Sequence, residues 1–253
     1  MKKKYFNVYN LFVLTIFLFL TNCTQKKEFY PLSPSVKNEL KSCDVFFEKE
    51  QNKLCNTISE SRMSQYTGSM LMAVVDIIVM SRQENIAKEL SQDMEVICNH
   101  SSLNKKFREN IEEILRSCDW IEVKNVFHHT ESSMENGKNL SGNSDALINV
   151  KFVYGTSENF DNIYGTLYLD MTPESDHLKK ALDYNKDNSP PIFKFNVKTK
   201  YALPQPTDDK KKNVNIWISN KGILIKRAMD FILKDIQEKT RDILRNPEIL
   251  PDN

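Results

Sequence analysis

Histidine and acidic side chains that could bind a metal or transfer protons are few in this sequence. His128 and His129 are adjacent, and Glu131 follows two positions later. On a strand, neighbouring side chains point to opposite faces, so the two histidines would not bind one metal ion together. At a point where a strand runs into a loop, both histidines could bind the same metal ion. The pattern favours a partly exposed pair, and a small envelope hydrolase that uses these three residues is the alternative.

Motifs of the common enzyme classes are absent from the sequence. No histidine has HExxH spacing, no serine lies in GxSxG, and no glycine-rich phosphate-binding loop occurs. The acidic pair Glu112 and Glu113 falls in a helical pattern, where paired acids commonly lie on a solvated surface. We therefore expect a protein that is not an enzyme, with no metal site and no cofactor.

Four cysteines are spread over residues 43–118. Cys43, Cys55, Cys98 and Cys118 lack the CxxC spacing of redox and zinc sites. In an oxidising compartment an even number permits two disulfides, with three connectivities. The most local choice pairs Cys43 with Cys55 and Cys98 with Cys118. Four buried free thiols are the alternative.

The fifth cysteine, Cys23, ends a segment with the composition of a secretory signal. Residues 2–4 are lysines, and residues 11–20 are almost entirely Leu, Phe, Val and Ile. This run is too short to span a bilayer of about 30 Å as a helix, but it matches the apolar region of a signal peptide. Leu20-Thr21-Asn22-Cys23 resembles the processing site of a bacterial lipoprotein signal. Asn22 replaces the small residue that usually precedes the cysteine.

This resemblance implies that residues 1–22 are a signal peptide and that Cys23 carries a diacylglycerol thioether, with acyl chains such as palmitate. Each buried CH₂ of such chains contributes about 0.8 kcal/mol to membrane attachment. The Pro- and Ser-containing residues 24–38 would then be a tether. Thr24, rather than Asp, favours the outer membrane. An ordinary cleaved signal peptide and an amino-terminal transmembrane anchor are the alternatives.

The composition indicates one folded domain over residues 39–253. Of the 253 residues 40% are hydrophobic, enough to supply a core, and the formal net charge is +1. A nucleic-acid-binding protein needs a basic footprint that this balance does not provide. We expect no nucleic-acid partner.

Apolar residues recur with helical spacing in three segments, residues 63–97, 103–116 and 223–245. The first two predict an αα-hairpin that turns at residues 99–102. Residues 37–56 also predict a short helix.

Apolar and polar residues alternate with the period of a strand in five segments: residues 120–128, 148–154, 164–171, 193–203 and 214–218. A turn at residues 220–222 separates the last of these from the final helix. The order of elements predicts an α+β fold. Its antiparallel sheet of about five strands would be covered on one face by the amino-terminal helical hairpin and the carboxy-terminal helix.

Lysines occupy one side of the fourth predicted strand, at Lys194, Lys198 and Lys200. Together with the lysines at 210–212 they could form a basic patch for anionic headgroups, lipopolysaccharide or an acidic protein. A solvated sheet face with edge-protecting lysines is the alternative. Three aromatic residues could share that face and add a contact surface: Tyr164, Tyr168 and Trp217.

The sequence thus predicts a lipoprotein anchored through Cys23 in the periplasm or at the cell surface, on the outer membrane. Its domain would be a binding or assembly module whose partner is an envelope protein or a glycolipid. The first alternative is a carrier of lipid or another apolar ligand, with its site between the sheet and the Met-rich segment 63–80. The second is the hydrolase that uses the histidine pair.

Overall fold

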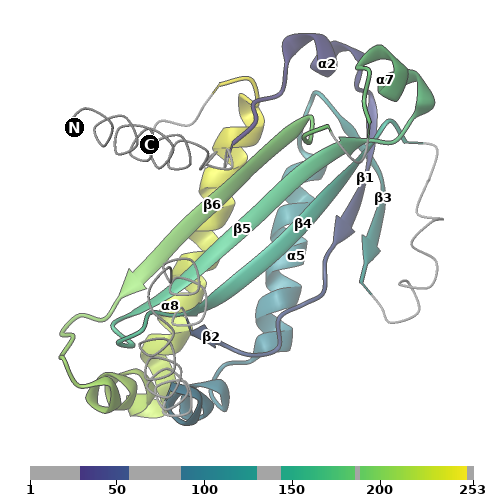
Figure 1. The fold of residues 1–253 in the computed structure, drawn as a ribbon. Helices are drawn as coiled ribbons and strands as arrows, with labels where there is room; N and C mark the ends of the chain where they lie inside the picture. The colour runs from purple at the N-terminus through teal and green to yellow at the C-terminus, as the bar shows by residue number, and fades with distance from the viewer. Residues whose placement is uncertain (1–28, 57–86, 130–143, 186–188, 250–253) are drawn as a thin grey trace, which may run out of the picture.

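A computed structural model describes residues 29–56, 87–129, 144–185 and 189–249. In chain order its elements are α2 (Pro34–Glu39), β1 (Ser42–Phe47), β2 (Cys55–Asn56), α5 (His100–Arg116), β3 (Glu122–His128), β4 (Ala146–Thr156), β5 (Asn162–Pro173), α7 (Asp176–Ala181), β6 (Phe193–Ala202) and α8 (Lys210–Arg245) (Figure 1). Residues 87–95 are also helical. Most of the predicted helix 63–97 lies outside the described residues.

The strands form one sheet in the order β3-β1-β4-β5-β6, and β2 pairs with the far end of β4. Strands β4, β5 and β6 are antiparallel, but β1 runs parallel to both β3 and β4. The predicted α+β class is confirmed, with a mixed sheet in place of an antiparallel one. Four of the five predicted strands are present, as β3, β4, β5 and β6.

Strand β1 lies where the sequence predicts a helix over residues 37–56, so that prediction is wrong. Between two parallel neighbours β1 is buried on both faces, and five of its six residues are buried. A strand of this kind shows no alternation of apolar and polar residues. Only residues 34–39 form a helix in this part of the chain.

Helices α5 and α8 cover one face of the sheet, which in Figure 1 is the face behind the strands. A row of aromatic rings lies beneath α5. Phe107 of α5 stacks on Phe152 of β4 with ring centroids 4.3 Å apart, and Phe47 and Tyr154 continue the row on either side. The apolar core therefore sits between this face and the two helices. The other face carries polar side chains.

Helix α8 has two parts joined by a left-handed turn. Asn220, Lys221 and Gly222 have φ angles of 51°, 59° and 68°, which confirms the predicted turn. The first part is helical from Lys210, because the Asp209 side chain accepts hydrogen bonds from the backbone N–H groups of residues 211 and 212. The predicted strand 214–218 is therefore wrong.

Buried polar groups fasten this first part of α8 to the turn between β4 and β5. Asn213 is fully buried and donates from Nδ2 to the carbonyls of Asn159 and Thr207, at 2.8 Å each. Trp217, also fully buried, donates from Nε1 to the carbonyl of Phe160 at 2.7 Å. Val214 and Trp217 are three residues apart, which places both on the inner side of a helix. Trp217 is thus absent from the open sheet face, contrary to the prediction.

The described part of the predicted tether packs on the domain. Tyr30 pairs with Lys194 of β6 through two backbone hydrogen bonds of 2.7 and 3.0 Å. Leu32 is buried, and its N–H donates to the carbonyl of Pro247. The folded unit therefore begins by Tyr30 rather than at residue 39.

Between β1 and β2, the side chain of Gln51 takes the place of a strand partner for β4. Its Oε1 accepts from the N–H of Tyr154 at 3.2 Å, and its Nε2 donates to the carbonyl of Tyr154 at 2.6 Å. The carbonyl of Gln51 accepts from the Tyr154 hydroxyl and from Asn104 of α5. This residue therefore joins the sheet to α5.

Replacing Gln51 with glutamate should destabilise the fold by about 1–3 kcal/mol, because the carboxylate removes one donor and faces the carbonyl of Tyr154. The free energy of unfolding in urea would measure the effect. Gln92→Glu, at an exposed helical position, is the matched control and should change the stability by less than about 0.5 kcal/mol. Equal stability of the two variants would contradict this role of Gln51.

Candidate functional site

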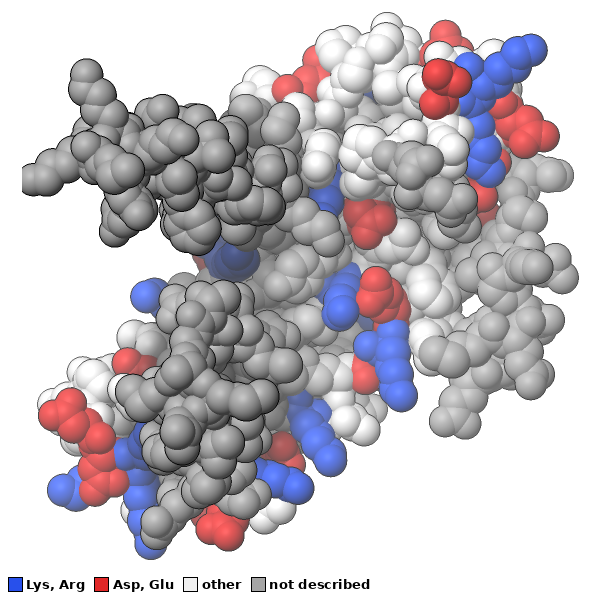
Figure 2. Space-filling view, viewed as in Figure 1, with Lys and Arg blue, Asp and Glu red and all other residues white. Residues whose placement is uncertain are grey.

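The face of the sheet that points away from α5 and α8, here called the open face, carries the predicted lysine row. Lys194, Lys198 and Lys200 alternate with buried residues along β6, which confirms that all three share one face. The register sets Lys194 beside Asp170, and Lys200 beside Tyr164. Acidic and basic side chains are interspersed over the visible part of this face (Figure 2).

A concave site of about 580 Å³ extends around the edge strand β6, from the open face of the sheet to the second part of α8, and we call it the β6–α8 groove. Lys198 and Lys200 contribute the basic side chains of β6, and α8 adds an exposed aromatic ring, Phe231. The described residues that line it are Tyr164, Thr166, Lys198, Thr199, Lys200, Phe231, Asp235 and Lys239. The groove thus combines ammonium groups with aromatic rings.

The close approach of α8 to the sheet at this groove depends on Gly165 of β5. A Cβ atom at this position would lie 2.4 Å from Cγ2 of Ile232 in α8. Any larger residue would push the helix outward. The glycine thereby places Phe231 and Asp235, which flank Ile232 in α8, near the lysines of β6.

Lysines outnumber carboxylates among the described residues of the β6–α8 groove. Three lysines accompany one carboxylate, Asp235, which pairs with Lys239 at 2.6 Å. Burial acts to raise the pKa of Asp235, but hydrogen bonds from Lys239 and Thr199 and the charge of Lys239 outweigh it, so the pKa is lowered. The carboxylate therefore stays ionised at neutral pH. The groove favours an anionic ligand.

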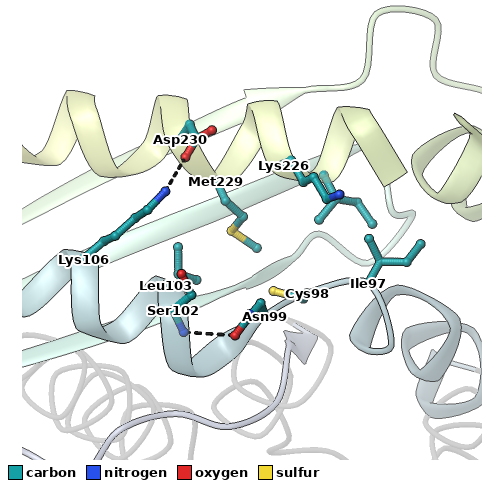
Figure 3. A pocket seen from close by; sticks show the side chains of 10 residues that line it. Ile97, Cys98, Asn99, Ser102, Leu103, Lys106, Lys226, Met229 and Asp230 are labelled. Atoms are coloured by element: carbon teal, nitrogen blue, oxygen red, sulfur yellow. Dashed lines mark hydrogen bonds and ion pairs between the residues drawn. The ribbon is translucent and has the colours of Figure 1, made fainter. Parts of the chain in front are cut away.

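A second, smaller pocket of about 210 Å³ lies between α5 and α8 (Figure 3). Leu103 and Met229 form part of its apolar wall. At its rim Lys106 of α5 and Asp230 of α8 form an ion pair of 3.5 Å. The further lining residues are Ile97, Cys98, Asn99, Ser102, Ile225 and Lys226.

The histidine pair lies at the end of β3. The ring of His128 stacks on Phe47 at a centroid distance of 5.6 Å, and the N–H of His129 donates to the Phe47 carbonyl. Burial, with a smaller effect from Arg108, lowers the pKa of His128. Glu131 lies outside the described residues. Within the described ranges, no three His, Cys, Asp or Glu side chains are placed to hold a metal ion.

His100, the first residue of α5, packs against Tyr154 of β4. Its Nδ1 lies 2.7 Å from the hydroxyl of Tyr154, which itself donates to the Gln51 carbonyl. The other ring nitrogen, Nε2, is buried and makes no hydrogen bond with any residue that the structure describes. Burial lowers the pKa of His100, although Glu95 opposes this.

The four described cysteines form no disulfide with one another. Cys43 and Cys55 pair with positions of β4 that are nine residues apart, Ala146 and Gly155. At about 3.3 Å per residue this places them about 30 Å from each other. A disulfide requires Cα atoms within about 7 Å, so the predicted pairing of Cys43 with Cys55 is wrong.

The predicted pairing of Cys98 with Cys118 is wrong for a similar reason. Cys98 precedes the 17-residue helix α5 and Cys118 follows it. At about 1.5 Å per residue the two residues are roughly 30 Å apart. Cys98 is buried, Cys118 is half-buried and Cys55 is exposed, so the alternative of four buried thiols also fails.

Tyr164 and Tyr168 lie on the open face as predicted, and Tyr168 is the more exposed, at 38%. The lysines at 210–212 begin α8, where Lys210 pairs with Glu158 and Lys212 with Asp209. Cys23 and the predicted signal lie outside the described residues. Among the helices that are described, none has the length and apolar character needed to cross a bilayer.

Comparison with known proteins gives a distant structural similarity only. No family model matches the chain, and no curated protein matches it. Two solved structures of PelC dodecamers from Paraburkholderia phytofirmans match with 8% sequence identity and a TM-score of 0.22. Each covers 78% of this chain, and the match covers 88% and 86% of theirs. Similarity at this level carries no argument about function.

Acidification should destabilise the protein through His100. Because the pKa of this histidine is lower in the folded state, the unfolded chain binds protons first as the pH falls below about 6.5. Stability should then fall by at most about 1.4 kcal/mol per pH unit. Urea unfolding between pH 7 and 5 would show this loss in the wild type and a smaller one in His100→Gln.

The matched control for this measurement is His177→Gln, because His177 is exposed on α7. That variant should keep the pH dependence of the wild type. If His100→Gln loses stability on acidification as steeply as His177→Gln does, the buried ring does not carry the effect.

Proposed function

We propose that this protein is a lipid-anchored envelope lipoprotein whose α+β domain acts by binding rather than by catalysis. The observation that carries the proposal is the β6–α8 groove, where Lys198, Lys200 and Lys239 surround a concavity that also exposes Phe231. A volume of about 580 Å³ falls in the usual range for small-molecule sites, about 300–1,000 Å³. The groove is therefore large enough to enclose a headgroup.

The composition of the groove favours an anionic glycolipid headgroup as the ligand. Lysines bind phosphate and carboxylate groups as point charges, and aromatic rings such as Phe231 and Tyr164 offer apolar faces to a sugar or acyl chain. An anchor at Cys23 would hold the domain beside a membrane, where such headgroups are concentrated. An acidic segment of an envelope protein is the competing partner.

A carrier of an apolar ligand is the second candidate. The segment 63–80, against which the sequence places that cavity, lies outside the described residues. The pocket between α5 and α8, with apolar walls from Leu103, Ile225 and Met229, is the observation in its favour. Stoichiometric lipid in the purified protein, measured by mass spectrometry, would favour this candidate over the binding module.

Reversing two charges in the groove should weaken binding to anionic glycolipid. The chain from residue 24 onward, which lacks the anchor, would be sedimented with vesicles that contain lipopolysaccharide and with neutral vesicles. Lys198→Glu with Lys200→Glu should lower the affinity for the anionic vesicles about 30-fold, because each lysine contributes about 1 kcal/mol near such a surface.

The matched control reverses two exposed lysines of α8 outside the groove, Lys211→Glu with Lys234→Glu. It makes the same change in net charge and should retain most of the affinity. Equal loss in both double variants would show that overall charge alone drives the association. Vesicle binding by neither the wild type nor the control would direct the search toward an acidic protein partner.

Replacing Cys23 with serine should release the protein from membranes, because serine cannot form the thioether that the lipoprotein signal implies. The variant should also keep its signal peptide and migrate as a larger species. Cell fractionation with metabolic labelling by palmitate would measure both effects. A variant that remains attached to membranes at the mature size would contradict the proposed anchor.

A further inference from the structure

The carboxy-terminal end of α5 contacts β3 at the position that pairs with the beginning of β1. Arg116, the last residue of α5, donates from Nη1 to the carbonyl of Val123 at 3.1 Å. Val123 is the residue of β3 that pairs with Cys43 of β1. Cys118 follows Arg116 by two positions, so the chain places Cys118 and Cys43 on either side of this contact.

Both thiols lie on the side of the sheet that α5 covers. Cys43 lies on the face of β1 that α5 covers, because Phe47, on the same side of the strand, contacts Phe107 of α5. Cys118 turns its Sγ back toward the helix and donates to the Ile114 carbonyl at 3.5 Å. Cys43 is fully buried and Cys118 is half-buried.

The pKa shifts of the two thiols are consistent with Cys43 and Cys118 lying near each other. Burial raises the pKa of Cys43 to about 12, and the neighbouring charges of Asp44 and of the Cys118 thiolate add to the effect. Burial likewise raises the pKa of Cys118 to about 11. Cys118 is therefore one of the ionisable groups close enough to act on Cys43.

We propose that Cys43 and Cys118 form a disulfide when the folded protein meets a disulfide oxidant. Such an oxidant is present in the compartments to which a signal peptide directs a chain. The pairing itself is a property of the fold and does not rest on the proposed function.

The reaction needs one oxidant molecule, such as oxidised glutathione. The more accessible Cys118 loses its proton and attacks a sulfur of glutathione disulfide, which forms a mixed disulfide and releases one glutathione thiol. Cys43 then loses its proton and attacks the Cys118 sulfur, which releases the second glutathione. Two protein thiols are oxidised and one disulfide is reduced to two thiols.

The bond would close a loop that contains β2, α5 and residues 57–86, and it would tie the crossover between the parallel strands β1 and β3 to the sheet. The remaining two cysteines do not make an equivalent pair. Cys55 is exposed at the edge strand β2, whereas Cys98 is buried where α5 and α8 meet. The proposal is therefore for one disulfide rather than two.

The test is a peptide map of the folded full-length protein after treatment with oxidised glutathione at mildly alkaline pH, with free thiols then blocked by alkylation. The expected product is a Cys43–Cys118 cross-linked peptide whose mass is lower than that of the two separate peptides by two hydrogen atoms. Oxidation should also raise the thermal midpoint by about 5–10 °C. The rate should rise about tenfold per pH unit, because the thiolate attacks.

Cys55→Ser is the matched control and should keep both the cross-link and the thermal shift. Cys118→Ser should lose both. Recovery of Cys43 and Cys118 as alkylated thiols, or of either one joined to Cys55 or Cys98, would overturn the proposal. The map of the wild-type protein decides the question even if Cys118→Ser does not fold.

Discussion

The hydroxyl group of Tyr154 is fully buried, and its need for hydrogen-bond partners determines how three segments meet. Leaving such a group without partners would cost about 1–3 kcal/mol. Here it donates to the carbonyl of Gln51 and lies 2.7 Å from the ring of His100. The segment between β1 and β2 and the start of α5 are thereby fixed to β4. With that end of α5 in place, Phe107 reaches Phe152 and the helix lies along the sheet.

The elements that the sequence predicts well are those with one buried and one solvated face. In β4, β5, β6 and α5 the burial pattern repeats the hydrophobic pattern of the sequence. Strand β1 gave no such signal, because both of its faces are covered and its six residues include a buried aspartate, Asp44. At residues 214–218 the alternating residues also fit helical spacing. The side chain of Asp209 caps the amino-terminal end of a helix at this point, so the segment is helical rather than a strand.

Three of the eight described lining residues of the candidate site were found from the sequence: Tyr164, Lys198 and Lys200. The alternation in β6 places Lys198 and Lys200 on one side, and the structure keeps them there. Phe231, Asp235 and Lys239 belong to a distant helix, and nothing in their spacing indicates that they meet β6. The contact requires Gly165, whose role is visible only when α8 lies across it. The predicted disulfide pairings were wrong because two cysteines that are close in the sequence can be far apart in space along a strand or a helix.

The pairing of Tyr30 with Lys194 determines how far the domain can stand from a bilayer. If Cys23 bears the lipid, seven peptide steps connect it to Tyr30, and even a fully extended chain of that length reaches only about 25 Å. The attachment point at Tyr30 is then confined to a thin layer above the lipid surface. Rotation of the domain is restricted as well, since the short tether attaches beside β6. The end of β6 that carries Lys194 would therefore stay close to the membrane.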